Sequence, residues 1–174
     1  FASLADPNWA LLPRAVQMMI ETIFLAFVAT TVAIPIAFVI CFLAAKNIMT
    51  HWAAFPIYVV IRIILNVMRS IEAFVWAIIF TVGVGIGPFA GMMALFIHSI
   101  ASLTKQYSEL VEVVDDGPIE GIQSTGASLI QTIWFAIVPQ VVLPFISFTV
   151  YRWDINIRMA TIVGFVGGGG IGYL

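Results

Sequence analysis

Three long stretches without a charged residue limit what this chain can fold into. They run between Glu21 and Lys46, between Glu72 and Lys105, and between Glu120 and Arg152. A helix needs about 20 predominantly apolar residues to cross the hydrocarbon core of a bilayer. Only 9% of the 174 residues are charged and 62% are hydrophobic, whereas a soluble domain typically has about 25% charged residues. So few charges cannot cover a water-facing surface, and the sequence therefore predicts an all-α polytopic membrane protein.

Turn-forming residues divide these stretches into about four predicted transmembrane helices. The first stretch forms one helix, in which Pro35 introduces a kink. The motif GVGIGP (83–88) splits the second stretch into two antiparallel helices. The expected spans are about 17–45, 57–82, 89–107 and 141–166, and residues 1–174 are expected to form a single transmembrane domain.

The basic residues are distributed unequally between the two ends of the predicted bundle. Four of them fall at one end: Lys46, Arg62, Arg69 and Lys105. Only Arg14 clearly falls at the other end. Because cytoplasmic loops are enriched in lysine and arginine, we expect the loop 45–56 and the segment 108–139 to be cytoplasmic.

The segment 115–139 begins as a polar, turn-rich sequence in an otherwise apolar chain. Asp116 is expected to cap a short helix that starts near Pro118. Glu120 falls in the first turn, where the helix dipole favours a negative charge. Gly126 is expected to end this helix, because the residue after a helix often needs a positive φ.

A second short helix is expected after Gly126. Ser128 and Gln131 have the spacing of a capping box, and Pro139 ends or kinks the helix that they open. The local sequence therefore predicts two short helices set at an angle on the cytoplasmic face. Taken alone, this pattern is equally compatible with an amphipathic connector at the membrane interface that has no further function.

The last expected span contains the polar sequence YRWDINIR, whose polar residues lie where a span should be apolar: Arg152, Asp154, Asn156 and Arg158. Intramembrane charge is costly unless it is paired or hydrated, so these residues indicate a functional site or a structural pair. Asp154 and Arg158 are four residues apart, which suits an ion pair. Arg152 points elsewhere on the helix and is left for an acidic side chain or for an anionic substrate, since a guanidinium group binds oxyanions in a bidentate way.

Other polar residues have simpler interpretations. Arg69 and Glu72 are expected to pair locally at the inner interface, and His98 is expected to bond a neighbouring helix rather than a metal. The one cysteine, Cys41, lies in an apolar run, so the sequence predicts neither a disulfide framework nor a metal site. No basic face suitable for nucleic acid is present.

The spacing E-x5-G-x12-P at Glu120, Gly126 and Pro139 resembles the EAA signature of binding-protein-dependent ABC importer permeases, which reads E-A-A-x3-G-x9-I-x-L-P. The glutamate, glycine and proline stand at the family spacing. Four other positions depart from the signature: Gly121 and Ile122 replace the two alanines, Ala136 replaces the isoleucine, and Val138 replaces the leucine.

The resemblance extends over most of the chain. Four segments are together similar to the permease subunit of phosphonate-type importers, the group that also takes phosphite and hypophosphite: GVGIGPFAGMMALFIHS, DDGPIEGIQSTGAS, VPQVVLPF and YRWDINIRMATIVGFVGGGGIG. The last segment resembles the branch pattern Y-R-F-E-x-N-x-R-x-A-T-V followed by V-G-x-G-G-I-G. Trp153 and Asp154 replace Phe and Glu in this pattern, and Gly168 stands where Ala is usual. The YRWDIN-R segment is what points to the phosphonate branch.

The resemblance implies a type I ABC importer permease fold in the bacterial inner membrane, with 115–139 as a cytoplasmic coupling helix that docks on an ATPase subunit. The docking residues would be Asp116, Gly117, Pro118, Glu120, Gly126, Ala127, Ser128 and Pro139. A glycine run toward the outer end of the pathway would act as a gate or hinge, or would serve close packing: Gly167, Gly168, Gly169 and Gly170. Family members carry further spans at both ends, so the four spans are expected to be a part of the subunit.

The chain contains no GxxxxGK[ST] phosphate loop, so ATP and Mg²⁺ are expected in a partner ATPase and no cofactor is expected here. The implied partners are a second permease copy, two ATPase subunits and an extracytoplasmic binding protein for phosphonate or phosphite. The alternatives are an importer of another small solute, a passive channel and an intramembrane enzyme. No HExxH or GxSxG motif supports the enzyme, and a channel needs no ATPase-docking segment.

Overall fold

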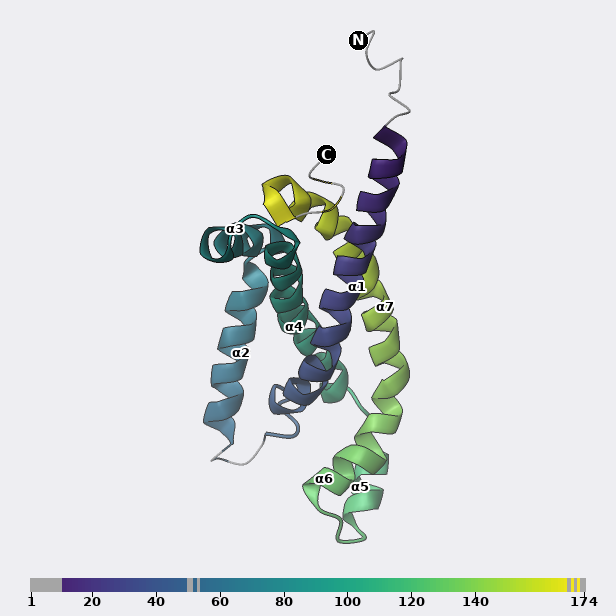
Figure 1. The fold of residues 1–174 in the computed structure, drawn as a ribbon. Coiled ribbons are helices and arrows are strands. Elements are labelled where there is room, and N and C mark those ends of the chain that lie inside the picture. Colours follow the sequence, from purple (N-terminus) through teal and green to yellow (C-terminus); the bar gives the residue numbers. More distant parts are fainter. Residues whose placement is uncertain (1–10, 50–51, 53, 169, 171, 173–174) are drawn as a thin grey trace.

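The computed structural model describes residues 11–49, 52, 54–168, 170 and 172. In this part of the chain every regular element is a helix, so the expected all-α fold is confirmed (Figure 1). The elements are α1 (Leu12–Leu43), α2 (Phe55–Ser70), α3 (Ala73–Val84), α4 (Pro88–Glu112), α5 (Asp116–Gln123), α6 (Leu129–Thr132), η3 (Ile133–Ile137), α7 (Val138–Val163) and η4 (Gly164–Gly168).

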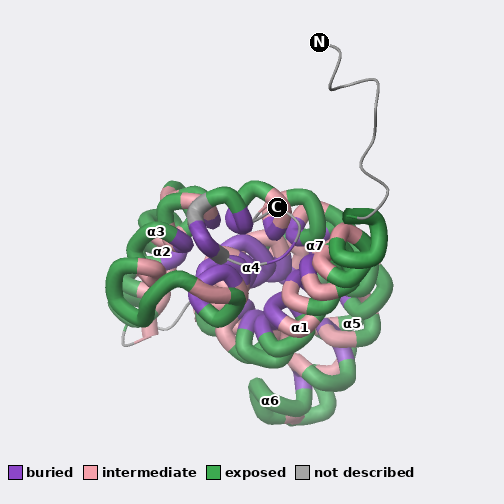
Figure 2. The backbone as a smooth tube through the Cα atoms, turned by 45° about the horizontal axis from the view of Figure 1, so that its top comes forward, coloured by how far each residue is buried: buried purple, intermediate pink, exposed green. Residues whose placement is uncertain are grey.

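α4 lies at the centre of the bundle. It packs against α1, α2, α3 and α7, and Figure 2 shows its buried residues enclosed by the other helices. Many of these residues are small: Ala90, Gly91, Ala94, Ser99, Ala101, Ser102 and Ser108. Small residues allow close approach of helix backbones in a membrane. The central position also explains why α4 can carry polar side chains, since they face protein rather than lipid.

Two helical segments are each long and apolar enough to cross a bilayer: α1 and the continuous segment Leu129–Val163. α2 and α3 meet this criterion only as a pair, which is bent by 89°. The GVGIGP motif separates α3 from α4 as expected, and Gly85 has a φ of 102°. Pro35 lies inside α1 without ending it. Helices are present where spans were expected at 17–45, 89–107 and 141–166, namely α1, α4 and α7, although α4 is not among the segments that meet the spanning criterion.

The single helix expected over 57–82 is wrong. The backbone is extended at Ile71 (φ −90°, ψ 117°) and at Glu72 (φ −64°, ψ 153°), and α3 leaves this point at 89° to α2. Because the helix is broken between them, Arg69 and Glu72 do not form the expected ion pair in the described part of the chain.

Side chains from other helices support the break. Nδ1 of His98 lies 3.1 Å from the carbonyl oxygen of Ile71, and Nε1 of Trp76 donates to the carbonyl oxygen of Met68 at 3.4 Å. A carbonyl can only accept, so the proton of His98 is on Nδ1. These bonds serve carbonyl groups that the end of α2 leaves without helical partners. The expectation that His98 bonds a neighbouring helix is confirmed.

A buried amide joins three helices. Asn156 of α7 is fully buried. Its Nδ2 donates to Oγ1 of Thr30 in α1 and to Oγ of Ser99 in α4, both at 2.6 Å. Near the end of α4 that leads into α5, Tyr107 bonds Thr149 of α7 and stacks on Phe145. These contacts fix α1, α4 and α7 as one unit.

Asn156→Ala should lower the free energy of unfolding by about 1–3 kcal/mol. It removes two interhelical hydrogen bonds, each about 0.6 kcal/mol on average in a membrane, and it leaves a cavity. Thermal unfolding of the detergent-solubilised permease measures the loss. Ser147→Ala is the matched control, because the exposed Ser147 hydroxyl bonds only the carbonyl of Leu143 in its own helix. Equal stability of the two variants would contradict the three-helix role of Asn156.

Candidate functional site

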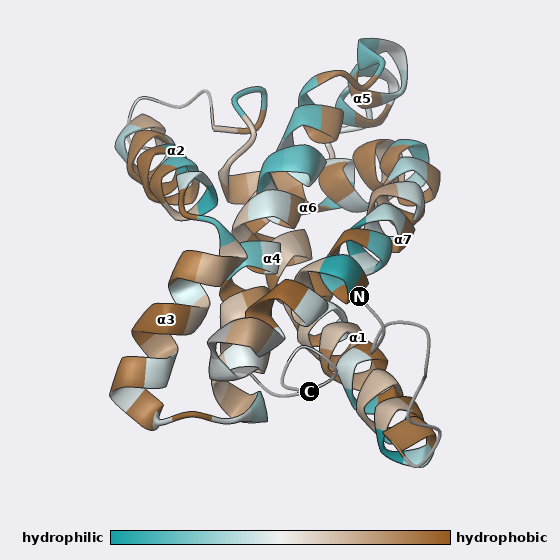
Figure 3. Ribbon diagram, turned by 90° about the horizontal axis from the view of Figure 1, so that it is seen from above, coloured by the Kyte–Doolittle hydropathy of each residue, from teal (hydrophilic) through white to brown (hydrophobic). Residues whose placement is uncertain are grey.

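A segment between α4 and α7, polar in its first part, projects from one end of the bundle (Figure 1). It consists of α5, a turn, α6 and the π-helical η3. α5 has no buried residue, and Figure 3 shows hydrophilic residues concentrated on it while α3 is largely hydrophobic. The end of α1 at Leu43 and the start of α2 at Phe55 lie at the same end of the bundle (Figure 1).

The second short helix does not end at Pro139. α6 continues through η3 into α7, and Pro139 lies in the first turn of α7. No loop therefore separates α6 from a helix of the bundle core.

The turn chemistry of the segment is largely as expected, with one correction. Asp115 rather than Asp116 is the N-cap of α5, because its Oδ1 accepts the backbone N–H of Gly117 at 3.0 Å. Asp116 is the first helical residue. Gly126 has the expected positive φ of 79°, but α5 already ends at Gln123, so Gly126 lies in the turn that follows rather than directly at the helix end. Ser128 and Gln131 form the expected capping box, in which the backbone N–H of Ser128 donates to Oε1 of Gln131 at 2.8 Å.

Gln140 ties α5 to α7, and sequence analysis missed it. Its Oε1 accepts the backbone N–H of Asp115 at 3.0 Å, and its Nε2 donates to the carbonyl oxygens of Asp115 at 3.3 Å and Ala136 at 2.9 Å. Ile119 of α5 adds an apolar contact with the core cluster that contains Tyr107. The one sequence signal for this clamp is an amide directly after Pro139 at the start of an apolar run.

Gln140→Leu should loosen α5 without unfolding the bundle. The variant loses three neutral hydrogen bonds, each with a net value of about 1 kcal/mol, and part of that loss is offset by water. We expect amide hydrogen exchange in α5 to become about ten-fold faster, as measured by mass spectrometry. Gln123→Leu is the control, because Gln123 is exposed and its side chain makes no hydrogen bond among the described residues. Similar exchange in both variants would contradict the clamp.

The four polar residues of the last span separate into distinct environments. Asn156 belongs to the buried network between helices. Arg158 and Asp154 form an ion pair on an exposed face of α7. Arg152 is 6% exposed, and its Nη2 donates to the carbonyl oxygen of His98 at 3.3 Å. Of the three charged residues Arg152, Asp154 and Arg158, only Arg152 is therefore directed into the protein.

The two glycine-rich runs meet at the end opposite α5. A Cβ at Gly167 (φ 92°) would lie 2.8 Å from Cγ2 of Ile86, and Gly170 (φ 76°) lies against Thr22. Gly168 belongs to η4, and Gly169 lies outside the described residues. A cavity of about 230 Å³ lies between the runs, lined by Met18, Glu21, Ile86, Gly87, Pro88, Gly167 and Gly170.

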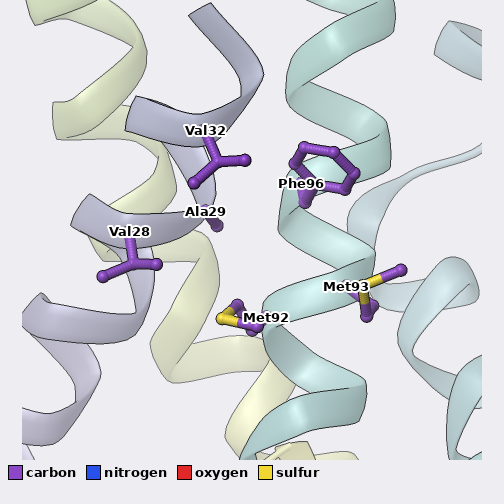
Figure 4. Close-up of a pocket in the computed structure, with 6 residues that line it drawn as sticks. All are labelled: Val28, Ala29, Val32, Met92, Met93 and Phe96. Atoms are coloured by element: carbon purple, nitrogen blue, oxygen red, sulfur yellow. The ribbon is translucent and has the colours of Figure 1, made fainter.

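A different cavity lies between α1 and α4. Figure 4 shows its lining of aliphatic, thioether and aromatic side chains: Val28, Ala29, Val32, Met92, Met93 and Phe96. It has a volume of about 110 Å³ and no polar surface. An anion would lose its hydration there without gaining a partner, so this cavity is unsuited to a charged solute.

Comparisons with known proteins agree with this architecture. The sequence model of the family described as "Binding-protein-dependent transport system inner membrane component" matches residues 48–174. The chain is 35% identical over 158 residues to the phosphite transport system permease protein PtxC of Stutzerimonas stutzeri, covering 91% of this chain and 56% of that protein. It is 38% identical over 160 residues to the phosphate-import permease protein PhnE of Mycolicibacterium smegmatis, covering 92% of this chain and 30% of that protein. The chain thus spans about half or less of the length of these relatives.

A solved structure supports the same fold. A chain of the MetNI methionine ABC transporter, in an inward-facing conformation, is similar with a TM-score of 0.80 and 21% identity. The similarity covers 96% of this chain and 81% of that chain. The all-helical bundle therefore has the type I permease fold expected for it. Since the family match covers most of the sequence, this chain belongs to the binding-protein-dependent transport system inner membrane components, which are transport permeases rather than enzymes.

Proposed function

We propose that this chain is part of the permease subunit of an ATP-driven importer for phosphonate or a related phosphorus oxyanion. The observation that carries the proposal is the exposed helix pair α5–α6, with Glu120, Gly126 and Pro139 at the EAA spacing and with no loop before α7. Two relatives are named for phosphite transport and phosphate import, which supports a phosphorus oxyanion as substrate.

α5, the turn after it and the first turn of α7 dock on a cytoplasmic ATPase subunit, which binds ATP and Mg²⁺. The residues that form this surface are Asp116, Gly117, Pro118, Glu120, Gly126, Ala127, Ser128 and Pro139. Three features support a coupling role: the N-cap at Asp115, the capping box at Ser128, and the clamp at Gln140. They make the segment stiff, and a stiff segment can transmit a displacement of the ATPase into α7.

The working transporter contains two permease subunits, two ATPase subunits and an extracytoplasmic binding protein. The second permease is a copy of this one or a close relative. Apolar side chains such as Ile63, Val67 and Leu143 are half or more exposed on the helices of the bundle, and lipid or a second permease covers them. The ion pair Asp154–Arg158 also lies on an exposed face, where we place it against water or a neighbouring helix rather than lipid.

The outer end of the pathway is formed by the glycine runs. Gly167, Gly168, Gly169 and Gly170 act as a hinge that opens and closes against the 83–88 turn. The close contact between Gly167 and Ile86 supports this role, since any larger side chain would hold the two runs apart.

Reconstituted uptake tests the proposed function. The full-length permease, its ATPase and its binding protein are assembled in proteoliposomes, and uptake of phosphite, methylphosphonate, hypophosphite and phosphate is measured. We expect uptake of at least one of these anions only with both ATP and the binding protein. Uptake that needs neither would identify a passive channel. ATP-driven uptake of an unrelated solute, without uptake of any of these anions, would agree with an importer but contradict the proposed substrate class.

A further inference from the structure

A polar cavity of about 370 Å³ lies where α2, α3, α4 and α7 meet, and it is open on the side of Arg69, Ser70 and Glu72, which are exposed. Every side chain of its lining is polar: Arg69, Ser70, Glu72, His98, Ser102, Gln106 and Arg152. Its volume is at the small end of the range for ligand pockets, about 300–1,000 Å³. It therefore has room for one small tetrahedral oxyanion with several waters, each of which takes about 30 Å³.

The cavity lies deep in the membrane-spanning part of the protein. Arg69 is about 21 Å along α2 from Phe55, and Arg152 is about 21 Å along α7 from Val138, at 1.5 Å per residue. His98 is about 15 Å along α4 from Pro88, at the opposite end. The hydrocarbon core of a bilayer is about 30 Å thick, so these residues lie near its middle. Charged groups at this depth need water, a partner or a ligand.

The guanidinium group of Arg152 has unused hydrogen-bonding capacity. The side chain is 94% buried, because its exposed fraction is 6%. Nη2 donates to the carbonyl oxygen of His98, whereas Nε is buried without a hydrogen-bond partner, and no carboxylate pairs with Arg152 among the described residues. Gln106 brings an amide whose Nε2 can donate to an anion; its Oε1, an acceptor, is also buried without a partner. A buried unpaired donor on a cation is costly unless another group meets it.

The charges of the lining favour an anion. Arg69 and Arg152 carry two positive charges and Glu72 carries one negative charge, and no ion pair joins them in the described part of the chain. His98 uses Nδ1 to bond Ile71. Ser102 adds a hydroxyl group, whereas the hydroxyl of Ser70 donates to the carbonyl oxygen of Asn66 at 2.8 Å. Two forked guanidinium groups, together with the hydroxyl of Ser102 and the amide of Gln106, suit the three or four oxygens of a tetrahedral anion.

We propose that this cavity is the intramembrane binding site of the transported phosphorus oxyanion, with Arg69 and Arg152 as its anion-binding residues. The proposal rests on the proposed function for the identity of the anion. Glu72 keeps the site weak by opposing the two arginines. A weak site is required in a transport path, because the solute has to leave as readily as it enters.

A labelling experiment tests the site without requiring transport. Cys41 is buried and is replaced by alanine, and Ser70→Cys places a thiol in the cavity of the full-length permease in its assembled transporter. Two thiol reagents of similar size are compared, the anionic sulfonatoethyl and the cationic trimethylammonioethyl methanethiosulfonate, each corrected for its rate with free cysteine. We expect the anionic reagent to be favoured, and Arg152→Gln or Arg69→Gln to lower the anionic-to-cationic ratio by at least about five-fold through loss of one nearby charge.

Control variants separate local charge from general effects. Arg158→Gln removes a charge from the same helix but outside the cavity lining, and should leave the ratio unchanged. Glu72→Gln removes the opposing charge and should raise it. Phosphite at millimolar concentration should slow labelling of Ser70→Cys, and Arg152→Gln should abolish this protection. If both arginine variants label like the parent, or if Arg158→Gln has the same effect as Arg152→Gln, the anion site is wrong.

Uptake supplies the second measurement. Arg152→Gln should lower uptake of the transported anion at least about ten-fold while the binding protein still stimulates ATP hydrolysis. Arg152→Lys should restore only part of the uptake, because lysine keeps the positive charge but lacks the forked guanidinium group. An Arg152→Gln transporter with normal uptake would overturn the proposal. If the parent transports no phosphorus oxyanion but keeps an arginine-dependent preference for the anionic reagent, the cavity remains an anion site and the proposed substrate class is wrong.

Discussion

Gly126→Val should sharply lower ATP-driven uptake while the permease still inserts and assembles. Gly126 has a φ of 79°, and a Cβ at this position would meet no atom within 4 Å. The effect is therefore one of backbone conformation, because a β-branched residue in the left-handed region costs about 1–3 kcal/mol. The strain would be relieved by rotating α5 against α6. We expect uptake to fall at least about ten-fold, since a misplaced docking helix cannot follow the ATPase.

Gly126→Asn is the matched variant. Asparagine adopts the left-handed region much more readily than valine, and the space around the residue is open. Gly126→Asn should therefore retain most of the uptake, as measured in the same proteoliposomes with equal amounts of assembled permease. Normal uptake by Gly126→Val, or equal loss in both variants, would contradict the requirement for a left-handed residue in the coupling turn.

Glu112→Ala should produce the second large effect, a loss of stability at the end of the bundle that carries α5. Oε1 of Glu112 pairs with Arg62 of α2 and accepts the backbone N–H of Lys46 at 2.7 Å. Nε of Arg62 also donates to the carbonyl oxygen of Ala44 at 3.1 Å. The two side chains are 20% and 26% exposed, so breaking the pair should cost about 1–3 kcal/mol, less than the 3–5 of a fully buried pair.

A double-mutant cycle isolates this pair. Arg62→Leu combined with Glu112→Ala should lower the stability by less than the sum of the two single changes, because the double variant leaves no charged side chain without its partner. Thermal unfolding in detergent gives each stability. Glu109→Ala is the control, since its i, i+4 pair with Lys105 has a carboxylate side chain that is 55% exposed, and such pairs contribute about 0.3–0.5 kcal/mol. A Glu112→Ala variant as stable as Glu109→Ala would contradict a stabilising role of the Arg62–Glu112 pair at this end of the bundle.

Local chemistry allowed much of the fold and part of the coupling segment to be predicted. Charge-free stretches indicated α1, α4 and α7, and the GVGIGP motif indicated the break before α4, because these features act within a few residues. The same holds for the left-handed Gly126 and the capping box at Ser128. The shift of the N-cap from Asp116 to Asp115 is a one-residue error within a run of two equivalent caps.

Features that depend on contacts between distant residues could not be predicted. No glycine or proline marks the 89° bend after Ser70, which His98 and Trp76 support from α4 and α3. Arg69 lies in the last turn of α2, just before the bend, and lines the polar cavity together with Arg152. The pair Arg62–Glu112 and the clamp from Gln140 to Asp115 likewise join segments far apart in sequence. Such pairs leave no periodic pattern in the sequence.

Side-specific labelling tests most directly whether α5 docks on an ATPase at the cytoplasmic face. In the Cys41→Ala background, Gln123→Cys places a thiol on the exposed end of α5, and Val84→Cys places one at the opposite end, where Val84 is 61% exposed. A membrane-impermeant maleimide should label Gln123→Cys only from the cytoplasmic side, and bound ATPase subunit should protect it. Val84→Cys should react only from outside. Labelling of Gln123→Cys from outside, or equal labelling with and without the ATPase, would contradict the coupling role of α5.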